Sequence, residues 1–389
     1  MRMQLVRDEE LAVLSTANFF SRYHYYLIAF VTSTFLAGFL STITLGWVIA
    51  GISTAITLSL AVMPKIFDRA GTRRILVLLG LLEISIVIAL TLVASAAPAA
   101  VLLALQGMCS YNIFLGLDLL LQAHTTDEHK TGHFRGLFLA LTNTSVLAAT
   151  FTISVVLHDH NFAEVFLMAA AAAVPFTLLA ASLPSISHVA GMHTSFKMHT
   201  FREIWNRPSL LTTMCAHFLL LVFFAWMMFY LPLYFYTAIG LSATWTFLLM
   251  TLSLLPYMLI EYPIGVIADN YIGEKEMALG GYVIMILGTA FIAYVNGTAL
   301  LPWIAVVLFG NVGGAMVEVT TETHFFKHVA VTDSNIISVF RMLRPLAAIL
   351  APALASLALF FVSFQNLFLV FGVILCCGIP FVLAMHDTK

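Results

Sequence analysis

Two glutamates, Glu318 and Glu322, lie four residues apart at the end of a long apolar run. In a helix this spacing places both carboxyl groups on one face. Neighbouring carboxylates resist ionising together, so one member of such a pair can carry a proton. The alternative is that both are solvated residues near the lipid head groups. Asp118, which precedes Glu318 by 200 residues, has the same two interpretations.

A further acidic residue, Glu261, lies inside the apolar run 243–264, eight residues before Asp269. At a helical rise of about 1.5 Å per residue, Glu261 is about 12 Å from the loop that contains Asp269. An ionised carboxylate at that depth needs a partner, and Arg344 is the first candidate. The pair is either part of a moving gate or a static link between two helices. For Glu83, which is similarly deep, we expect a structural hydrogen bond.

No residue pattern supports metal binding or catalysis. His129 and His133 have helical i,i+4 spacing, but no cysteine or carboxylate pattern completes a metal site, so we predict none. A nucleophile–base set and a phosphate-binding loop are both missing from the sequence. We therefore predict neither an enzyme nor a bound cofactor.

The composition indicates whether the folded chain lies in water or in a membrane. Hydrophobic residues make up 61% of the 389 residues and charged residues only 9%, whereas soluble domains carry about 25% charged residues. The chain is therefore predicted to lie in a membrane, with lipids around it. Its net charge of −2 gives no basic surface, so we expect no nucleic-acid partner.

Apolar runs long enough to span a bilayer, about 20 residues each, occur twelve times. They cover residues 23–41, 44–63, 75–95, 98–121, 136–157, 163–184, 209–236, 243–264, 277–297, 299–320, 336–357 and 365–385. The chain is thus predicted to be an all-α membrane protein with 12 transmembrane helices.

A polar segment in the middle divides these helices into two groups of six. The predicted divisions are an N-terminal cytoplasmic segment, a first six-helix bundle, a central cytoplasmic linker, a second six-helix bundle and a cytoplasmic tail, at residues 1–22, 23–184, 185–208, 209–385 and 386–389. Within the linker, a short interfacial helix is expected around Phe196–Trp205. With both termini in the cytoplasm, all 17 Lys and Arg residues fall at inner ends or inner loops, as the positive-inside rule requires.

Two segments of the first half have counterparts in the second half. The stretches "MPKIFDRAGTRR" (63–74) and "EYPIGVIADNYIGEKE" (261–276) each end the second helix of their half, and their aspartates are 201 residues apart. "DLLLQAH" (118–124) and "EVTTETH" (318–324) are 200 residues apart. Two pairs at nearly one offset indicate an internal duplication.

These residues resemble the major facilitator superfamily of secondary transporters. The motif that follows the second helix of that family, Gly-x-Leu-x-Asp-Arg-x-Gly-Arg-Arg, is matched in the first half by Asp68, Arg69, Gly71, Arg73 and Arg74. The counterpart in the second half is matched by Gly265, Asp269, Gly273 and Lys275. The run "FRMLRPLAAILAP", which contains Arg341 and Arg344, also looks like the eleventh helix of the family. Pro64 departs from the motif, because it replaces the first glycine.

The resemblance implies a gate on the cytoplasmic side. Asp68 is expected to pair with the start of the helix at 336–357, where Arg341 or Arg344 supplies the positive charge. By the pseudo-twofold symmetry, Asp269 should face Arg135 at the start of the helix at 136–157. The alternative is that both aspartates belong to purely structural turns.

Two departures place the chain outside the drug–proton antiporter subtype of the superfamily. The fourth helix of those exporters carries an arginine where this chain has Leu103, and their fifth helix carries a Gly-Pro signature that the run 136–157 lacks.

In this family the midpoints of the first, fourth, seventh and tenth helices line a central cavity. The corresponding residues are Thr32, Thr34, Gln106, Asn112, Trp226, Tyr230 and Asn311. None of them is charged, which favours a neutral or amphiphilic small-molecule substrate.

The resemblance therefore implies a monomeric secondary active transporter that works by alternating access in the bacterial inner membrane, with protons as a candidate coupling ion. One alternative is a flippase or exporter of lipids or hydrophobic compounds. The other is a non-transporting membrane sensor or scaffold with the same fold.

Overall fold

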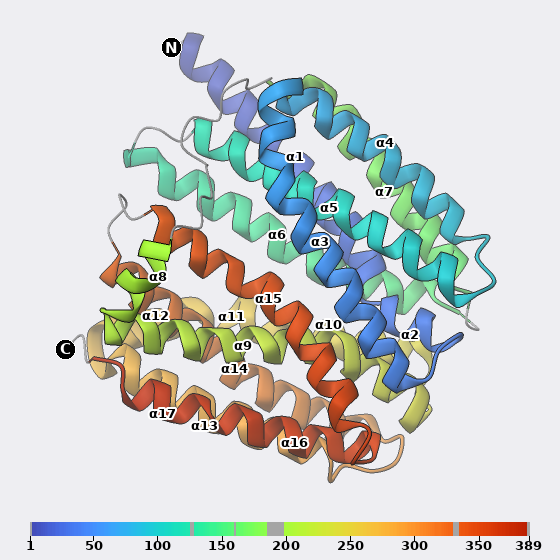
Figure 1. Cartoon of the computed structure of the whole chain (residues 1–389), viewed down its shortest axis with the longest axis vertical. Coiled ribbons are helices and arrows are strands. Elements are labelled where there is room, and N and C mark those ends of the chain that lie inside the picture. The colour runs from blue at the N-terminus through green and yellow to red at the C-terminus, as the bar shows by residue number, and fades with distance from the viewer. Residues whose placement is uncertain (1, 125–127, 159–160, 185–197, 330–333, 387–389) are drawn as a thin grey trace. The chain divides into compact units, whose positions relative to one another are not determined.

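The computed structural model describes the chain except residues 1, 125–127, 159–160, 185–197, 330–333 and 387–389. The described residues form helices and no strand (Figure 1). The helices of the first half are α1 (Arg2–Ala29), α2 (Thr32–Ala37), α3 (Thr42–Ala70), α4 (Thr72–Leu90), α5 (Ala96–His124), α6 (Glu128–Val156) and α7 (Phe162–Ser182). A short helix, α8 (Met198–Trp205), follows close to the predicted position of the interfacial helix.

The second half begins with α9 (Pro208–Leu233), which continues as the π-helix η1 (Tyr234–Ile239). The remaining elements are α10 (Ala243–Ser253), α11 (Leu255–Leu259), α12 (Glu261–Ile267), η2 (Ala268–Ile272), α13 (Glu274–Ile292), α14 (Leu300–His328), α15 (Ser334–Ala358), α16 (Phe364–Cys376) and α17 (Gly378–Leu383).

Nine spans within the described part of the chain are long and apolar enough to cross a membrane. They correspond to nine of the twelve predicted helices. The other three predicted spans correspond to the end of α1 together with α2, to α4, and to the later part of α6. In α6 the apolar stretch among the described residues is Ala140–Val156, which is shorter than the nine spans, and α4 contains Arg73, Arg74 and Glu83.

Three predicted spans differ in outline from the observed helices. The first is predicted to begin at residue 23, but α1 begins at Arg2 because good helix formers continue the helix upstream of the apolar run. The predicted helix 243–264 is interrupted at Leu254 and Ile260. Pro256 and Pro263 lack the N–H that would continue the backbone hydrogen bonds across those points. Pro380 explains the break between α16 and α17 in the same way.

The contacts divide the chain into two compact units. Unit 1 comprises Met1–Leu40 and Gly51–His193, and unit 2 comprises Ser41–Ala50 and Thr194–Lys389. Residues 41–50, which the sequence assigns to the first bundle, are grouped with unit 2. There the Ser356 hydroxyl donates a hydrogen bond to the Ile43 carbonyl at 2.8 Å.

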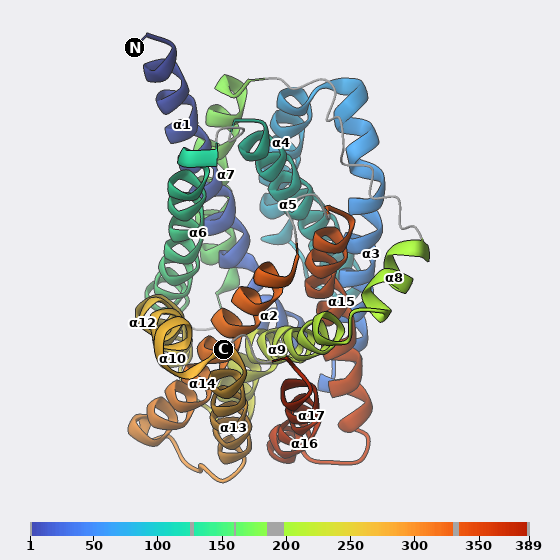
Figure 2. The same ribbon diagram turned by 90° about the vertical axis from the view of Figure 1, so that its left-hand side faces the viewer.

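Unit 1 is built around α1, which packs against α5, α6 and α7, while α4 packs against α5 and α7. Both views show α1 and α6 side by side (Figures 1 and 2). A buried apolar cluster joins these helices and includes Leu14, Leu76, Ile113 and Phe176.

In unit 2, α9 packs against α14, α15 and α17, and α13 packs against α14 and α16. The α13–α14 contact is close because glycines face each other across it. An added Cβ at Gly281 would lie 2.9 Å from the Gly313 carbonyl oxygen. Small residues allow such backbone approach between membrane helices.

Candidate functional site

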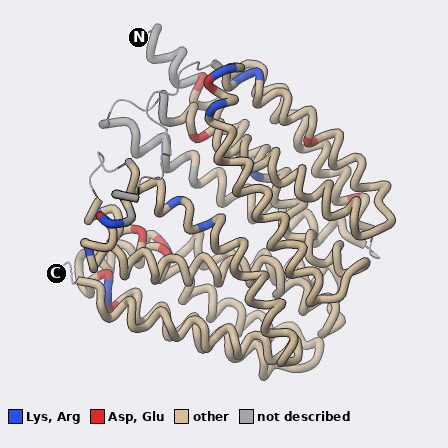
Figure 3. The backbone as a smooth tube through the Cα atoms, in the orientation of Figure 1, with Lys and Arg blue, Asp and Glu red and all other residues tan. Residues whose placement is uncertain are grey.

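Unit 2 contains a group of three acidic side chains, Glu261, Glu318 and Glu322, which we call the carboxyl cluster. The carboxyl groups of Glu261 and Glu318 are in hydrogen-bonding contact, and Glu322 interacts electrostatically with both. Arg344 approaches from α15, with its Nη2 atom 3.8 Å from Glu318 Oε1. The charged residues of unit 2 gather toward the end of its helices where α14 ends and α15 begins (Figure 3).

Local structure accounts for the position of each acid. Glu318 and Glu322 share a face of the continuous helix α14, as their spacing predicts. Glu261 is the first residue of α12 because the predicted helix is interrupted at Ile260. A carboxylate in the first turn of a helix is stabilised by the free backbone N–H groups there. α12 packs against α14, and Glu261 interacts there with Glu318.

Arg344 reaches the carboxyl cluster at Glu318. The sequence favours Arg344 as the first candidate partner of Glu261. In the structure, Arg344 forms an ion pair with Glu318, which in turn interacts with Glu261, and a direct pair of Arg344 with Glu261 stays a prediction. The Arg344 side chain is 56% exposed, so this contact at 3.8 Å is a weak one.

The geometry has a chemical consequence. An ionised carboxylate is an acceptor only, so a hydrogen bond between two carboxyl groups requires a proton on one of them. A hydrogen bond between Glu261 and Glu318 therefore requires that at least one of them is a carboxylic acid. The arrangement can hold a proton and release it, because loss of the proton turns an attractive contact into a repulsive one.

Tyr257 on α11 lies beside the carboxyl cluster, close enough to interact with Glu261 and Glu318. Its hydroxyl donates a hydrogen bond to Asn311 Oδ1 at 3.0 Å. Gly314 makes room for this hydroxyl, since an added Cβ there would overlap it. Asn311 is among the residues predicted from the sequence, but Tyr257 is not, because an aromatic residue in an apolar run usually serves packing.

Aromatic contacts extend this group toward α9. The rings of Phe224 and Tyr257 meet edge to face, with centroids 5.4 Å apart. The Arg344 guanidinium lies 6.0 Å from the centre of the Phe224 ring, within cation–π range. Neutral polar, aromatic and ionisable groups from α9, α11, α12, α14 and α15 therefore meet in one region of unit 2.

The predicted cavity residues of unit 1 make local hydrogen bonds. Thr32 and Thr34 donate to carbonyl groups of nearby residues, at 2.9 Å in each case. Gln106 donates to Ser110 at 2.9 Å, and Asn112 donates to Ser59 at 2.8 Å. Their contact with a solute stays a prediction.

In unit 2, the predicted cavity residues Trp226 and Tyr230 are buried, with exposures of 1% and 0%. The Trp226 indole donates to the Ala351 carbonyl, and the Tyr230 hydroxyl donates to the Pro352 carbonyl at 3.2 Å. Both side chains hold α9 against α15. Among the aromatic residues of α9, Phe224 contacts Tyr257 and lies near Arg344.

The motif glycines have equivalent conformations in the two units. Gly71 precedes α4 with φ 83°, and Gly273 precedes α13 with φ 105°. Side chains rarely adopt such positive φ values, which explains glycine at both places. This equivalence supports the internal duplication.

The other predicted gate residues differ in their exposure. Asp68, Lys275 and the α12 residue Gly265 are partly buried, as is Asp118 on α5, whereas Arg69, Arg73, Arg74 and Arg341 are exposed. The side chains of Asp269 and Arg135 lie outside the described residues. The cytoplasmic latch therefore stays a prediction.

Metal binding has no support in the described part of the chain, where no group of three or more His, Cys, Asp or Glu residues could hold an ion.

Comparisons with known proteins identify a family and several similar structures. Residues 14–336 match the Major Facilitator Superfamily. No curated protein matches the sequence. The structure is similar to that of the nucleoside transporter NupG, with a TM-score of 0.77 and 14% identity over 98% of this chain and 100% of that one. A point mutant of NupG matches at the same TM-score and coverage, with 13% identity.

A third similar structure is a POT family transporter in complex with a thioalcohol conjugated peptide. Its TM-score is 0.69, with 14% identity over 96% of this chain and 94% of that one. At such identities these likenesses show the fold alone.

The match over most of the chain establishes the family. The chain belongs to the Major Facilitator Superfamily, and it has the all-α membrane fold of those proteins. It is thus a multi-pass membrane transporter and not an enzyme.

Proposed function

We propose that this transporter moves a small neutral or amphiphilic solute across the cell membrane in exchange for, or together with, protons, which bind at the carboxyl cluster. The observation that carries the proposal is the contact between the Glu261 and Glu318 carboxyl groups. A hydrogen bond between the two carboxyl groups needs a proton on at least one of them.

The proton would change the conformational preference of unit 2. With the proton bound, Glu261 on α12 and Glu318 on α14 attract each other. When the proton leaves, two carboxylates face each other and Glu322 adds a third negative charge. At about 4 Å and an effective dielectric constant of about 20, each such repulsion is on the order of 4 kcal/mol. That is enough to shift an equilibrium between two arrangements of packed helices.

The groups beside the carboxyl cluster suggest the class of solute. Asn311 and Tyr257 offer neutral hydrogen-bonding groups, and Phe224 and Tyr257 offer aromatic faces. A planar, uncharged molecule with hydroxyl or amide groups satisfies both. Nucleosides have this chemistry, and NupG, a similar structure, is described as a nucleoside transporter. We therefore propose nucleosides as the first substrate class to test.

The test is uptake into proteoliposomes. With radiolabelled uridine and adenosine, an inward proton gradient should drive accumulation above the equilibrium level if protons and solute move together. An outward gradient should do so if they move in opposite directions. Glu318→Gln should abolish gradient-driven accumulation while sparing counterflow, since an amide can replace the hydrogen bond but cannot exchange a proton. Glu276→Gln, at an exposed position in the first turn of α13, is the matched control.

Three outcomes would contradict parts of the proposal. Accumulation that ignores the proton gradient in the wild type would remove proton coupling. Unchanged accumulation in Glu318→Gln would remove the carboxyl cluster as its site. A thermal-shift screen in which organic anions bind and neutral compounds do not would remove the solute class. Movement of labelled lipid in the same liposomes would favour the flippase alternative.

A further inference from the structure

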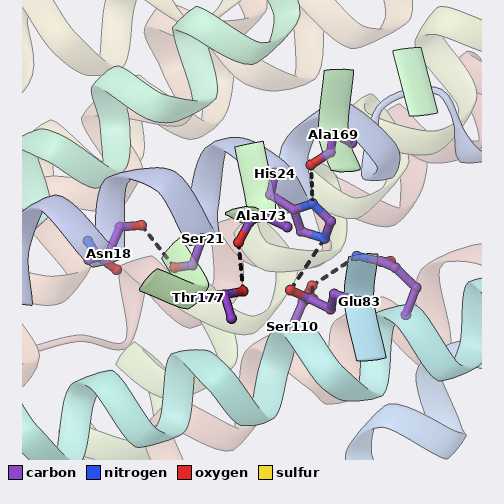
Figure 4. A network of polar contacts seen from close by, with 9 residues as sticks. Asn18, Ser21, His24, Glu83, Ser110, Ala169, Ala173 and Thr177 are labelled. Carbon is purple, nitrogen blue, oxygen red and sulfur yellow. Dashed lines mark hydrogen bonds and ion pairs between the residues drawn. The ribbon is translucent and has the colours of Figure 1, made fainter. Parts of the chain in front are cut away.

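A second pair of ionisable side chains lies in the interior of unit 1. His24 on α1 and Glu83 on α4 face each other there, with exposures of 0% and 1%. Ser110 and Gln106 on α5 complete the group at 1% and 3%. Figure 4 shows the imidazole of His24 between the Ala169 carbonyl on α7 and the Glu83 carboxyl group. Four helices thus meet at one buried histidine.

The hydrogen bonds determine where the protons on the ring must be. His24 Nδ1 lies 2.8 Å from the Ala169 carbonyl oxygen. A carbonyl oxygen only accepts, so Nδ1 carries a hydrogen and donates it. The other ring nitrogen, Nε2, faces Glu83 Oε2 at 3.4 Å. The second carboxyl oxygen of Glu83 accepts a hydrogen bond from the Ser110 hydroxyl, and Ser110 accepts one from Gln106 at 2.9 Å.

This geometry requires one further proton. If His24 were neutral, Nε2 would present a lone pair to the carboxylate, and two acceptors would face each other. The buried negative charge of Glu83 would then lack compensation, which is costly away from water. A proton on Nε2 gives an imidazolium–carboxylate pair, and a proton on Oε2 gives an imidazole–carboxylic acid pair. Both arrangements contain the same single proton.

The groups that interact with the pair come from α5 and α7. From α5, the Cys109 thiol interacts with Glu83 in addition to Ser110. From α7, the Ala169 carbonyl faces the ring. Among the described residues, Glu83 is the charged side chain that interacts with His24, and none from α6 or α7 does so. The compensating positive charge must therefore be the proton itself.

We propose that His24 and Glu83 form a proton-binding site in unit 1, separate from the carboxyl cluster of unit 2. The bound proton holds α1 to α4 and α5, and its loss would leave a buried anion among these helices. Because the pair is almost fully buried, release requires α1 to separate from α4 far enough for water to enter. The site is therefore a proton-dependent contact between helices of one unit.

The number of bound protons can be measured without any transport assay. A histidine in the unfolded chain loses its proton above a pH of about 6.5, whereas the buried pair keeps it. Stability must then decrease as the pH rises through this range, because the folded state binds one more proton than the unfolded state. The unfolding equilibrium constant should increase by up to about tenfold per pH unit.

Glu83→Gln is the reference variant. The glutamine amide can donate to Nε2 and its carbonyl can accept from Ser110, so the geometry is kept and the extra proton is no longer needed. Full-length wild type and variant would be unfolded by titration with SDS in mixed micelles between pH 7 and pH 8.5. The ratio of their unfolding constants should increase about 30-fold over this range, because one extra proton is bound by the folded wild type throughout it. Contributions from the carboxyl cluster are common to both proteins and cancel.

A ratio that stays constant with pH would overturn the proposal, because the pair would then bind no extra proton. If Glu83→Gln does not fold, the double variant His24→Gln/Glu83→Gln serves as the reference, with an expected increase of about 20-fold and the same contrary result. Failure of proton-coupled transport at Glu318 would leave this measurement unaffected, so the two proposals fail independently.

Discussion

The close contact between α13 and α14 provides a quantitative test of the packing in unit 2, because two adjacent glycines of α13 have different surroundings. An added Cβ at Gly281 would lie 2.8 Å from Met316 Cβ, 2.9 Å from Val317 Cγ2 and 2.9 Å from the Gly313 carbonyl oxygen. An added Cβ at Gly280 would meet only Met316 Cε, at 3.7 Å. Non-bonded carbon atoms prefer about 3.5–4.0 Å, so the Gly281 contacts fall short by more than about 0.5 Å.

Gly281→Ala should therefore force α13 and α14 apart, whereas Gly280→Ala should not. Overpacking of this kind costs about 1–3 kcal/mol. Both variants gain the same helix propensity from alanine, up to about 1 kcal/mol, so this gain cancels when they are compared. Gly281→Ala should be less stable than Gly280→Ala by about 1–3 kcal/mol, which is about 5–150-fold in the unfolding equilibrium constant.

The measurement is SDS-induced unfolding of the two purified variants beside the wild type, followed by helical circular dichroism. Gly280→Ala is expected to be as stable as the wild type or slightly more stable. Equal stability of the two variants would show that α13 and α14 do not approach each other as closely as the structure has them. A more stable Gly281→Ala would refute the steric reasoning outright.

Two other predictions concern charged residues. Lys327→Met removes the ammonium group that contacts the carboxylate of Glu274, a side chain that is 1% exposed. Because Lys327 is itself 44% exposed, the expected loss is about 1–3 kcal/mol rather than the larger cost of a fully buried pair. The double variant Glu274→Gln/Lys327→Met should recover part of this lost stability. If the stability losses of the single variants Glu274→Gln and Lys327→Met simply add in the double variant, a direct interaction between the two side chains is excluded. At the predicted latch, Asp269→Asn should increase labelling of cysteine probes on the cytoplasmic side, and unchanged labelling would remove the latch hypothesis.

The sequence predicted the fold well because hydrophobicity dictates it. A membrane-spanning segment must satisfy its own backbone hydrogen bonds, so each long apolar run becomes a helix. The deviations come from residues that a hydropathy average ignores. Pro256, Pro263 and Pro380 break helices without interrupting the apolar pattern. The helix-forming residues before position 23 extend α1 without being apolar.

The candidate site was only partly predictable. The relation between Glu318 and Glu322 follows from helical spacing alone. The contact between Glu261 and Glu318 depends on how α12 packs against α14, and spacing says nothing about that. The contact between His24 and Glu83 is still harder to predict from the sequence, because the group that orients the His24 ring is the backbone carbonyl of Ala169. A backbone carbonyl has no signature in a sequence.

The two proposed proton sites differ in a way that constrains how they could work together. Glu318 is 20% exposed and its partner Arg344 is 56% exposed, so the carboxyl cluster can exchange protons without a large rearrangement. His24 and Glu83 are at most 1% exposed, so their proton can leave only when the helices of unit 1 separate. Fast exchange suits a site that takes up and releases a proton in every transport cycle. Slow exchange suits a site that keeps its proton through the cycle. A rapid change of pH should therefore alter the carboxyl cluster at once and the His24–Glu83 pair only at the rate at which α1 opens from α4.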